Sequence, residues 1–291
     1  MVPLGEIAQY VVIGDSGALP DRSFVNVTPI ASNENQWTNE SGYPELSDAT
    51  WLAKNLDTTL GFYHRSFGMR SWDDQGSAFH AGIRGRGRSS TDRPDTNAYG
   101  ANGYMLIGDG RTSTGQAVSE ALDIVSHEFT HSVISASADF FYEREAGAIN
   151  ESLADFIGMT VAGHTTTQMG AAAGWAVRDL AQPMLFNQPE LYGDYQDLPL
   201  DTDYGGVHRN SGILNRALYR TARRISAETT EGALPLSQLL LDSLRDFSWS
   251  PQLLMEDFAV GLQVLCEHRA QAACSALASE LEASELLSPA L

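Results

Sequence analysis

The amino-acid sequence predicts an α+β protein with two lobes, a strand-rich lobe followed by a mainly helical one. Short apolar runs broken by Gly, Pro, Asn and Ser dominate the chain up to about residue 113, a pattern typical of strands and turns. From Ser119 onward, apolar residues recur at helical spacing. The chain has 291 residues, enough for two modest domains. Strands followed by helices favour an α+β arrangement.

The predicted elements follow in order along the chain. Residues 21–50 favour strands and turns. A helix is expected at 48–67 and should end at Gly68. Short strands are expected again within 70–113. The later helices are expected at 119–136, 148–163, 211–227, 235–247, 251–266 and 272–287. We place the domain boundary just after the first of these helices, which gives an N-terminal α+β lobe at 1–140 and a helical lobe at 141–291.

The net charge of −19 makes nucleic acid and anionic membranes poor partners, because the long-range field repels them. The Arg-rich stretch 80–90 can be interpreted as a phosphate-binding patch or as a solvated Gly-rich loop, and we prefer the loop. No apolar run approaches the roughly 18 to 20 residues needed to span a bilayer. The first basic residue is Arg22, so the start lacks a signal peptide's basic region. Either the protein is intracellular or this is a mature chain whose leader has been removed.

The segment His127-Glu-Phe-Thr-His131 carries the strongest chemical signal. On a helix, four residues correspond to about 400° of rotation and about 6 Å of rise, so both imidazoles point the same way and can hold one tetrahedral metal ion. Glu128 is offset by one residue and can act on a water beside that ion. This pattern is the zinc-protease motif. The alternative is a helix with two core-facing histidines that are satisfied by hydrogen bonds.

A third ligand is offered twenty residues after His131. Glu151 and Asp155 are four apart on a predicted helix and share a face. A hydrolytic zinc site needs three protein ligands and one open position, and Glu151 can supply the third. Asp155 can accept the free ring N–H of a ligand histidine and fix its tautomer. An isolated pair of this kind would otherwise be two solvated carboxylates on a helix surface.

Together these segments resemble the thermolysin-like neutral zinc metalloproteases. The resemblance rests on SHEFTHSV, FYEREAGAINESLADFIG and DYGGVHRNSGILNRALY, and it extends upstream through FYHRSFGMRSWDDQG (62–76) and NAYGANGYMLIGDG (97–110). It covers roughly residues 48–220. It implies a two-lobed zincin fold, with the helix that bears the two histidines at the floor of the cleft.

The resemblance also implies roles for individual residues. One zinc ion would be bound by His127, His131 and Glu151, with Asp155 behind the ligands and Glu128 as general base. His208 would stabilise the oxyanion, oriented by Asp203 and assisted by Tyr142. The substrate backbone would be held by Asn97 and Ala98, and its carbonyl by Arg178, for which a plain salt bridge is the alternative. The pocket after the scissile bond would be lined by apolar side chains of middling size, namely Val118, Ile124 and Val177.

Two departures from the family pattern bear on function. After NAY the family usually has Trp-Asn-Gly, whereas this chain has Gly100-Ala-Asn. The helical position of one family calcium carboxylate is Ala162, and residues 163–175 contain no Asp or Glu. Asp123 matches another calcium carboxylate, but one carboxylate cannot hold two divalent ions. We therefore predict that the paired calcium site is absent, the alternative being weak calcium binding elsewhere on the acidic surface.

Cys266 and Cys274 are eight residues apart. On one continuous helix their Cα atoms would be about 12 Å apart, beyond disulfide reach. A bridge is possible if residues 267–272 form a turn, and two buried free thiols are the alternative.

The sequence thus predicts a zinc-dependent endopeptidase that hydrolyses proteins or peptides on the amino side of apolar residues by a metal-activated water. We expect an extracellular monomer whose leader has been removed, as the resemblance implies. A zinc aminopeptidase is the nearest enzyme alternative, although it would lack the GGVHxNSG segment. A catalytically silent zinc-binding protein is the alternative outside enzymes, and it would be indicated by loss of Glu128 or His208, both of which are present.

Overall fold

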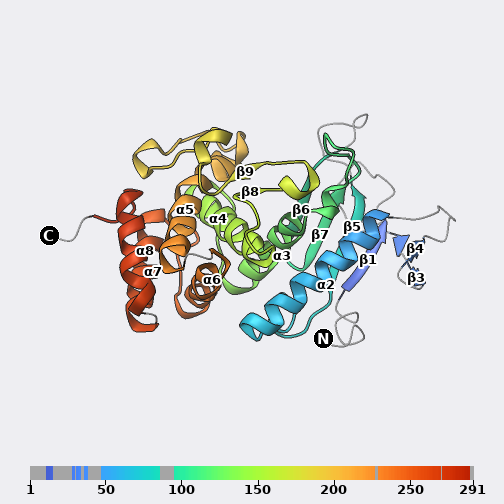
Figure 1. Cartoon of the computed structure of the whole chain (residues 1–291), viewed down its shortest axis with the longest axis horizontal. Helices are drawn as coiled ribbons and strands as arrows, with labels where there is room; N and C mark the ends of the chain where they lie inside the picture. The colour runs from blue at the N-terminus through green and yellow to red at the C-terminus, as the bar shows by residue number, and fades with distance from the viewer. Residues whose placement is uncertain are drawn as a thin grey trace. The chain divides into compact units, whose positions relative to one another are not determined.

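The computed structural model of the chain describes residues 11–15, 28–29, 31–33, 36–38, 47–85, 95–226, 229–269 and 271–288 (Figure 1). The chain divides into two compact units, Met1–Val133 with Gly170–Ala176, and Ile134–Met169 with Val177–Leu291. The first unit contains the main sheet and the second is mainly helical, so the predicted α+β class with two lobes is confirmed. Residues 1–10 and the Arg-rich positions 86–90 lie outside the described residues.

The first unit is built on a five-stranded mixed sheet of order β2-β1-β5-β7-β6. The central strands β1, β5 and β7 are parallel, whereas β2 and β6 pair antiparallel with their neighbours. The strands are β1 Val11–Asp15, β2 Thr28–Pro29, β5 Phe79–Gly85, β6 Ala98–Ala101 and β7 Tyr104–Gly108, and a separate hairpin joins β3 Ala31–Asn33 to β4 Gln36–Thr38.

Strands β6 and β7 form a tight hairpin whose two loop residues, Asn102 and Gly103, both have positive φ angles, 50° and 80°. Asn-Gly favours this turn because these residues adopt the left-handed region at low cost, and the turn's twist matches that of the strands. Among the described strands, β6 pairs with β7 alone, so β6 forms an edge of the sheet.

Helix α2, Ser47–Phe67, packs against α3, Leu122–Ser137, in the same unit. The apolar stripe of α2 is buried at Leu52, Leu56 and Leu60, as its helical spacing predicted, and Gly68 ends it with a φ of 68°. Buried hydroxyls link the two helices, with Tyr63 Oη 2.6 Å from Thr130 Oγ1. These contacts fix the rotation of α3 and hence the direction in which its polar face points.

The second unit is a helical bundle around α4. Every residue of α4 from Ala146 to Val161 is buried, and α5 lies between α4 and α8 (Figure 1). The close approach of α4 and α5 requires Gly147, because a Cβ there would lie 2.4 Å from Val207 Cγ1. The bounds are α4 Arg144–Val161, α5 Asp203–Ile225, α6 Thr229–Asp246, α7 Met255–Arg269 and α8 Gln271–Ala283, with a two-stranded pair of β8 Gln168–Met169 and β9 Arg178–Asp179.

Three helices begin four or more residues earlier than the sequence predicted. Helix α4 begins at Arg144 rather than 148, α5 begins at Asp203 rather than 211, and α6 begins at Thr229 rather than 235. The second difference arises at Gly205 and Gly206, whose φ angles of 85° and 89° form a left-handed turn at the start of α5, so His208 lies on the helix.

Cys266 of α7 and Cys274 of α8 are joined by a disulfide, with their Cα atoms 5.5 Å apart. The two helices end and begin between these residues, which is the condition under which the sequence allowed a bridge. Of the two alternatives that the sequence left open, the structure therefore contains the bridge.

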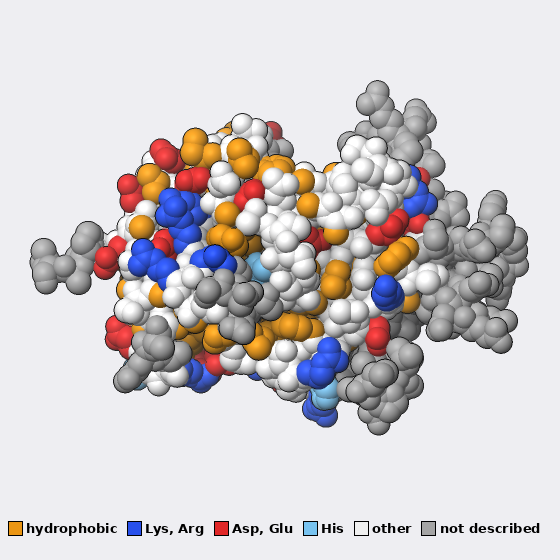
Figure 2. Space-filling model, viewed as in Figure 1, with side chains coloured by type: hydrophobic (Ala, Val, Ile, Leu, Met, Phe, Trp, Pro, Cys, Tyr) orange, Lys and Arg blue, Asp and Glu red, His pale blue; other side chains and the backbone are white. Residues whose placement is uncertain are grey.

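Basic side chains on the helical unit lie among acidic ones (Figure 2). Arg224 Nε lies 2.5 Å from a carboxylate oxygen of Glu280, and Arg269 bridges Asp242 and Asp246. These guanidinium groups are compensated locally. Across the ranges that the structure describes, no helix combines the length and apolar character that a membrane crossing requires.

Candidate metal centre

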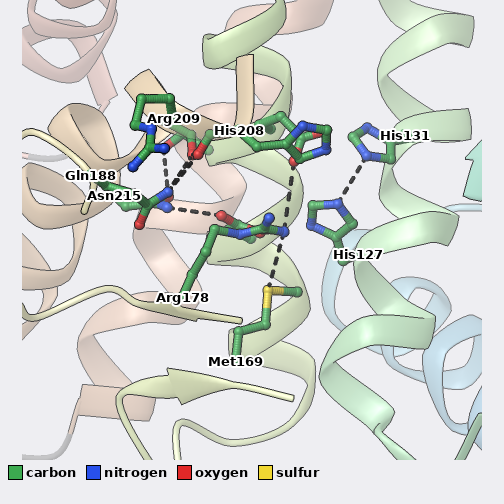
Figure 3. Close-up of polar contacts among 12 residues, drawn as sticks. His127, His131, Met169, Arg178, Gln188, His208, Arg209 and Asn215 are labelled. Carbon is green, nitrogen blue, oxygen red and sulfur yellow. Dashed lines mark hydrogen bonds and ion pairs between the residues drawn. The ribbon is translucent and has the colours of Figure 1, made fainter. Parts of the chain in front are cut away.

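Helix α3 brings His127 and His131 together in the first unit. Both side chains are buried, at 3% and 7% exposure, and their Nε2 atoms are 2.9 Å apart (Figure 3). Two nitrogens bound to one tetrahedral zinc ion would lie about 3.3 Å apart, which follows from Zn–N distances near 2.05 Å. Glu128 joins them in a group of three side chains whose potential ligand atoms lie within 4.8 Å of one another. The i,i+4 prediction therefore holds in the structure, and the group suits a metal ion.

The edge strand β6 lies directly on the backbone of α3. A Cβ built at Gly100 would lie 2.2 Å from the carbonyl oxygen of Glu128, a distance at which backbone must move. This contact gives a physical reason for the departure at this position, because the larger family residue would not fit the present strand. Nearby, Asn97 is exposed and Ala98 is buried at the start of the strand.

In the second unit, Glu151 of α4 is fully buried at the centre of a polar cluster. The Tyr142 hydroxyl donates to Glu151 Oε1, and His208 Nε2 lies 3.4 Å from that same oxygen. Tyr142 Oη and His208 Nε2 are themselves 3.3 Å apart. The structure thus brings together three residues that the sequence assigned to one site from three separate segments.

Asp203 holds His208 in place. Its Oδ1 accepts from His208 Nδ1 at 2.5 Å, and its Oδ2 accepts from the backbone N–H groups of His208 and Arg209 at 3.0 and 3.1 Å. A carboxylate only accepts, so Nδ1 carries the hydrogen. When His208 is neutral, its Nε2 is therefore the unprotonated nitrogen and faces Tyr142 and Glu151.

The backbone reaches this arrangement through four consecutive residues with positive φ. Asp203 and Tyr204 have φ angles of 53° and 51° and are followed by Gly205 and Gly206. Glycine adopts this region freely, whereas each non-glycine residue there costs about 1 to 2 kcal/mol. The three hydrogen bonds of Asp203 offset that strain, which is the kind of local cost that recurs at functional sites.

A second carboxylate, Asp155, lies one turn along α4 from Glu151 and is also fully buried. Its Oδ1 accepts from Arg178 Nη2 at 2.7 Å, and its Oδ2 accepts from Asn215 Nδ2 at 2.8 Å. Arg178 Nη2 also lies 3.6 Å from Glu151 Oε2 and 3.7 Å from the sulfur of Met169 (Figure 3). The salt bridge that we weighed for Arg178 is therefore present.

The charges of this cluster perturb its titratable groups. Loss of hydration alone would lower the pKa of His208, but the Glu151 carboxylate and the hydrogen bond to Asp203 hold that pKa above its ordinary value. Burial would likewise lower the pKa of Arg178, and the charges of Asp155 and Glu151 outweigh this and raise it. Two buried carboxylates thus face one guanidinium and one partly exposed imidazole.

The remaining predicted residues are distributed over both units. Val118 and Ile124 are buried in the first unit, at 0% and 4% exposure, whereas Val177 is half-buried in the second. Asp123, in the first turn of α3, accepts from the backbone N–H of Gly170 at 2.7 Å and of Ile124 at 2.9 Å. Burial raises the pKa of Asp123 above its ordinary value.

Asn215 and Gln188 are two members of the cluster that the sequence analysis missed. Asn215 lies seven residues after His208, two turns along the same helix, so its i,i+7 spacing was a usable signal. It also accepts from Ser152 Oγ at 2.8 Å, which ties it to α4. Gln188 precedes α5 by fifteen positions in an irregular loop, and nothing in its local sequence indicated a role.

Comparison with known proteins agrees with this geometry. Residues 14–135 match the thermolysin metallopeptidase catalytic domain, and residues 138–252 match the thermolysin metallopeptidase alpha-helical domain. The chain belongs to the thermolysin family of metallopeptidases. Members of this family depend on zinc, and the buried group of His127, Glu128 and His131 is the metal-binding group expected of a thermolysin-like chain.

Among the relatives, an extracellular elastase of Staphylococcus epidermidis is 35% identical over 190 residues, covering 63% of this chain and 36% of that protein. Neutral protease NprE of Bacillus pumilus is 32% identical over 181 residues, covering 61% and 58%. A zinc metalloproteinase of Listeria monocytogenes is 33% identical over 223 residues, covering 72% and 40%. The chain thus spans between 34% and 58% of the length of these and similar relatives.

Among solved structures, the fold is similar to that of the precursor of protealysin, a metalloproteinase from Serratia proteamaculans. The TM-score is 0.73 at 24% identity, with 95% of this chain and 87% of that chain covered. This likeness extends the thermolysin-like fold over nearly the whole chain.

Proposed function

We propose that this protein is a zinc-dependent endopeptidase that cleaves peptide bonds on the amino side of apolar residues. One zinc ion would be bound by His127, His131 and Glu151. The observation that carries the proposal is the pair of buried imidazoles on α3, 2.9 Å apart at Nε2, in a chain of the thermolysin family.

The donor set fits zinc. Two imidazole nitrogens and one carboxylate are the three protein ligands of a hydrolytic zinc site, with one position left open. Glu151 is fully buried with a second buried carboxylate, Asp155, one turn away. We propose that Asp155, already fixed by Arg178 and Asn215, also orients a ligand histidine through its ring N–H.

Zinc, when bound, would polarise the scissile carbonyl and acidify a water at the site. Glu128 takes the proton from the attacking water and passes it to the departing amine. The Tyr142 hydroxyl and protonated His208 donate hydrogen bonds to the oxygen that becomes negative, and Asp203 keeps the His208 ring in place. Asn97 and Ala98 hold the substrate backbone at the edge of the sheet, and Arg178 binds a substrate carbonyl.

Removing the metal should abolish hydrolysis. We expect an unfolded protein substrate to be digested by the untreated enzyme, left intact after treatment with a zinc chelator, and digested again after one equivalent of zinc is added back. The measurement is the rate of new amino-terminus formation alongside metal content by atomic emission. Full activity of a zinc-free preparation would refute the proposal.

The same assay separates the alternatives when the substrate is a peptide with an acetylated amino terminus. An aminopeptidase leaves such a peptide intact, whereas an endopeptidase cuts it internally. A silent zinc-binding protein would retain stoichiometric metal and cleave neither substrate.

Cleavage should favour Leu, Ile, Val or Phe immediately after the cut, because the proposed pocket is apolar and of middling size. Sequencing the products of a peptide library measures this preference. Ile124→Ala should enlarge the pocket and shift the preference from Leu towards Phe, whereas Val133→Ala, a comparably buried change on the same helix, should leave it unaltered. A dominant charged residue at this position would contradict the pocket assignment.

We also propose that the paired calcium site of the family is absent. Two calcium ions need several carboxylates, whereas the loop after α4 offers none between residues 163 and 175. Asp123 already accepts two backbone N–H bonds, one of them from Gly170 in that same loop.

Removing calcium with a chelator selective over zinc should therefore change the melting temperature by no more than about 2 °C, since stabilisation by a bound ion scales with its concentration over Kd. The measurement is thermal unfolding followed by circular dichroism with zinc content held constant. A large fall in the melting temperature that added calcium reverses would show that the loop does bind calcium.

The enzyme would act outside the cell as a monomer on proteins or peptides, after removal of a leader. The relative from Staphylococcus epidermidis is an extracellular elastase, which supports this location, and the net charge of −19 opposes association with nucleic acid.

A further inference from the structure

We propose that Gln188 is a positioning residue for His208, acting through the backbone of α5. The inference rests on the proposed oxyanion role of His208 and extends it to a loop that no sequence motif marks. Gln188 is 4% exposed, and its Nε2 donates to the His208 carbonyl oxygen at 2.6 Å (Figure 3).

The side-chain amide can take only one orientation here. Its nitrogen faces the His208 carbonyl, an acceptor, and also lies 3.2 Å from Ser211 Oγ. The Ser211 hydroxyl itself donates to the His208 carbonyl at 3.1 Å. A flipped amide would place its oxygen against that carbonyl, so the donor side must point at His208.

The loop lies close enough for this contact because Gly212 has no side chain. A Cβ at Gly212 would approach Gln188 Cβ to 2.7 Å and the Pro189 carbonyl oxygen to 2.8 Å. A second link runs the other way, from Arg209 Nη1 to the Asn187 carbonyl oxygen at 2.5 Å. The loop therefore contacts α5 at the turn that carries His208.

The position of His208 is thus fixed from two directions. Asp203 binds the backbone N–H and the ring on one side, and Gln188 binds the carbonyl on the other. Residues 203–206, which end just before Val207 and His208, are in left-handed conformations, so the first regular turn of α5 needs support from outside the helix. Gln188 supplies that support without touching the ring.

Gln188 contributes less to stability than its burial suggests. Its Oε1 is buried and has no hydrogen-bond partner among the described residues, which is a cost that a well-packed apolar side chain would avoid. Gln188→Met keeps the length of the side chain and removes both the donor and the unsatisfied oxygen. The melting temperature should therefore change little.

The experiment is the kinetic comparison of Gln188→Met with Thr221→Val in the full chain loaded with zinc. Thr221 is buried on the same helix, more than three turns beyond His208, and donates to the Ala217 carbonyl oxygen at 2.8 Å. The Thr221→Val variant therefore also loses one side-chain hydrogen bond to a backbone carbonyl, but far from His208. We expect Gln188→Met to lower kcat about 10-fold with KM and zinc content unchanged, and Thr221→Val to leave kcat unaltered.

Repeating Gln188→Met in a His208→Ala background decides the mechanism. If Gln188 acts through His208, the second substitution causes no further loss of kcat. An unchanged kcat in the single variant, or an equal 10-fold loss in both backgrounds, would overturn the inference. If His208→Ala alone leaves the rate unaltered, the oxyanion assignment itself fails, which is a separate and recognisable outcome.

Discussion

Glu128→Gln is expected to lower kcat by between about 10² and 10⁴-fold while the protein retains one equivalent of zinc. The amide keeps the size of the side chain and can still accept a hydrogen bond, but it cannot take up a proton. The two histidines that we propose as zinc ligands precede and follow this residue on α3 and are unaffected by the change. Stopped-time peptide hydrolysis and atomic emission on the same sample provide the two measurements.

Glu120→Gln is the matched control for the change in charge. Glu120 lies in the same unit, and its Oε1 accepts from the Ala117 backbone N–H at 2.9 Å, a bond that an amide oxygen can also accept. This variant should hydrolyse at the normal rate. If Glu128→Gln instead loses zinc in proportion to activity, Glu128 is a ligand and not the base.

The parts of the site predicted best from sequence are those set by helix geometry. The spacing of His127 and His131 fixes their common direction in any helix, and the structure adds only that both rings are buried. The boundaries of α2 followed from the stripe ending at Gly68 for the same local reason.

Pairings between distant segments could not be predicted in this way. Strand β1 pairs in parallel with β5. Parallel strands are joined by a long connection, so the local sequence of either strand does not indicate which strand it pairs with. The contact of Gln188 with the His208 carbonyl is equally non-local and uses a polar side chain that would ordinarily be assigned to the surface. The early start of α5 was also missed, because Gly205 and Gly206 build a left-handed turn that is closed by hydrogen bonds to Asp203 from the backbone N–H groups of His208 and Arg209.

Departures from the family pattern are informative where the structure supplies their cause. At Gly100 the strand lies so close to the Glu128 carbonyl that a side chain is excluded. Asp123 matches a family calcium carboxylate, but here backbone N–H groups bind its carboxylate. Both contacts involve backbone atoms, and such contacts cannot be deduced from residue types alone.

His208→Ala is expected to lower kcat/KM by about 10² to 10³-fold without loss of zinc, the scale for removing one donor to an oxyanion. Its Nε2 is 3.3 Å from the Tyr142 hydroxyl and 3.4 Å from Glu151, so it lies in the cluster of the proposed ligand without being required to bind metal. Asp203→Asn should give a smaller loss, because an amide oxygen in the place of Oδ2 can still accept the two backbone N–H bonds.

The exposed His268 on α7 provides the control. His268→Ala removes the same side chain from the same unit and should leave kcat/KM and the melting temperature unchanged. A His208→Ala variant that loses zinc would move His208 from oxyanion donor to ligand. An unaltered rate with zinc in place would remove His208 from the mechanism, and because the three hydrogen bonds of Asp203 all end at His208 or its neighbour Arg209, it would remove the orienting role of Asp203 as well.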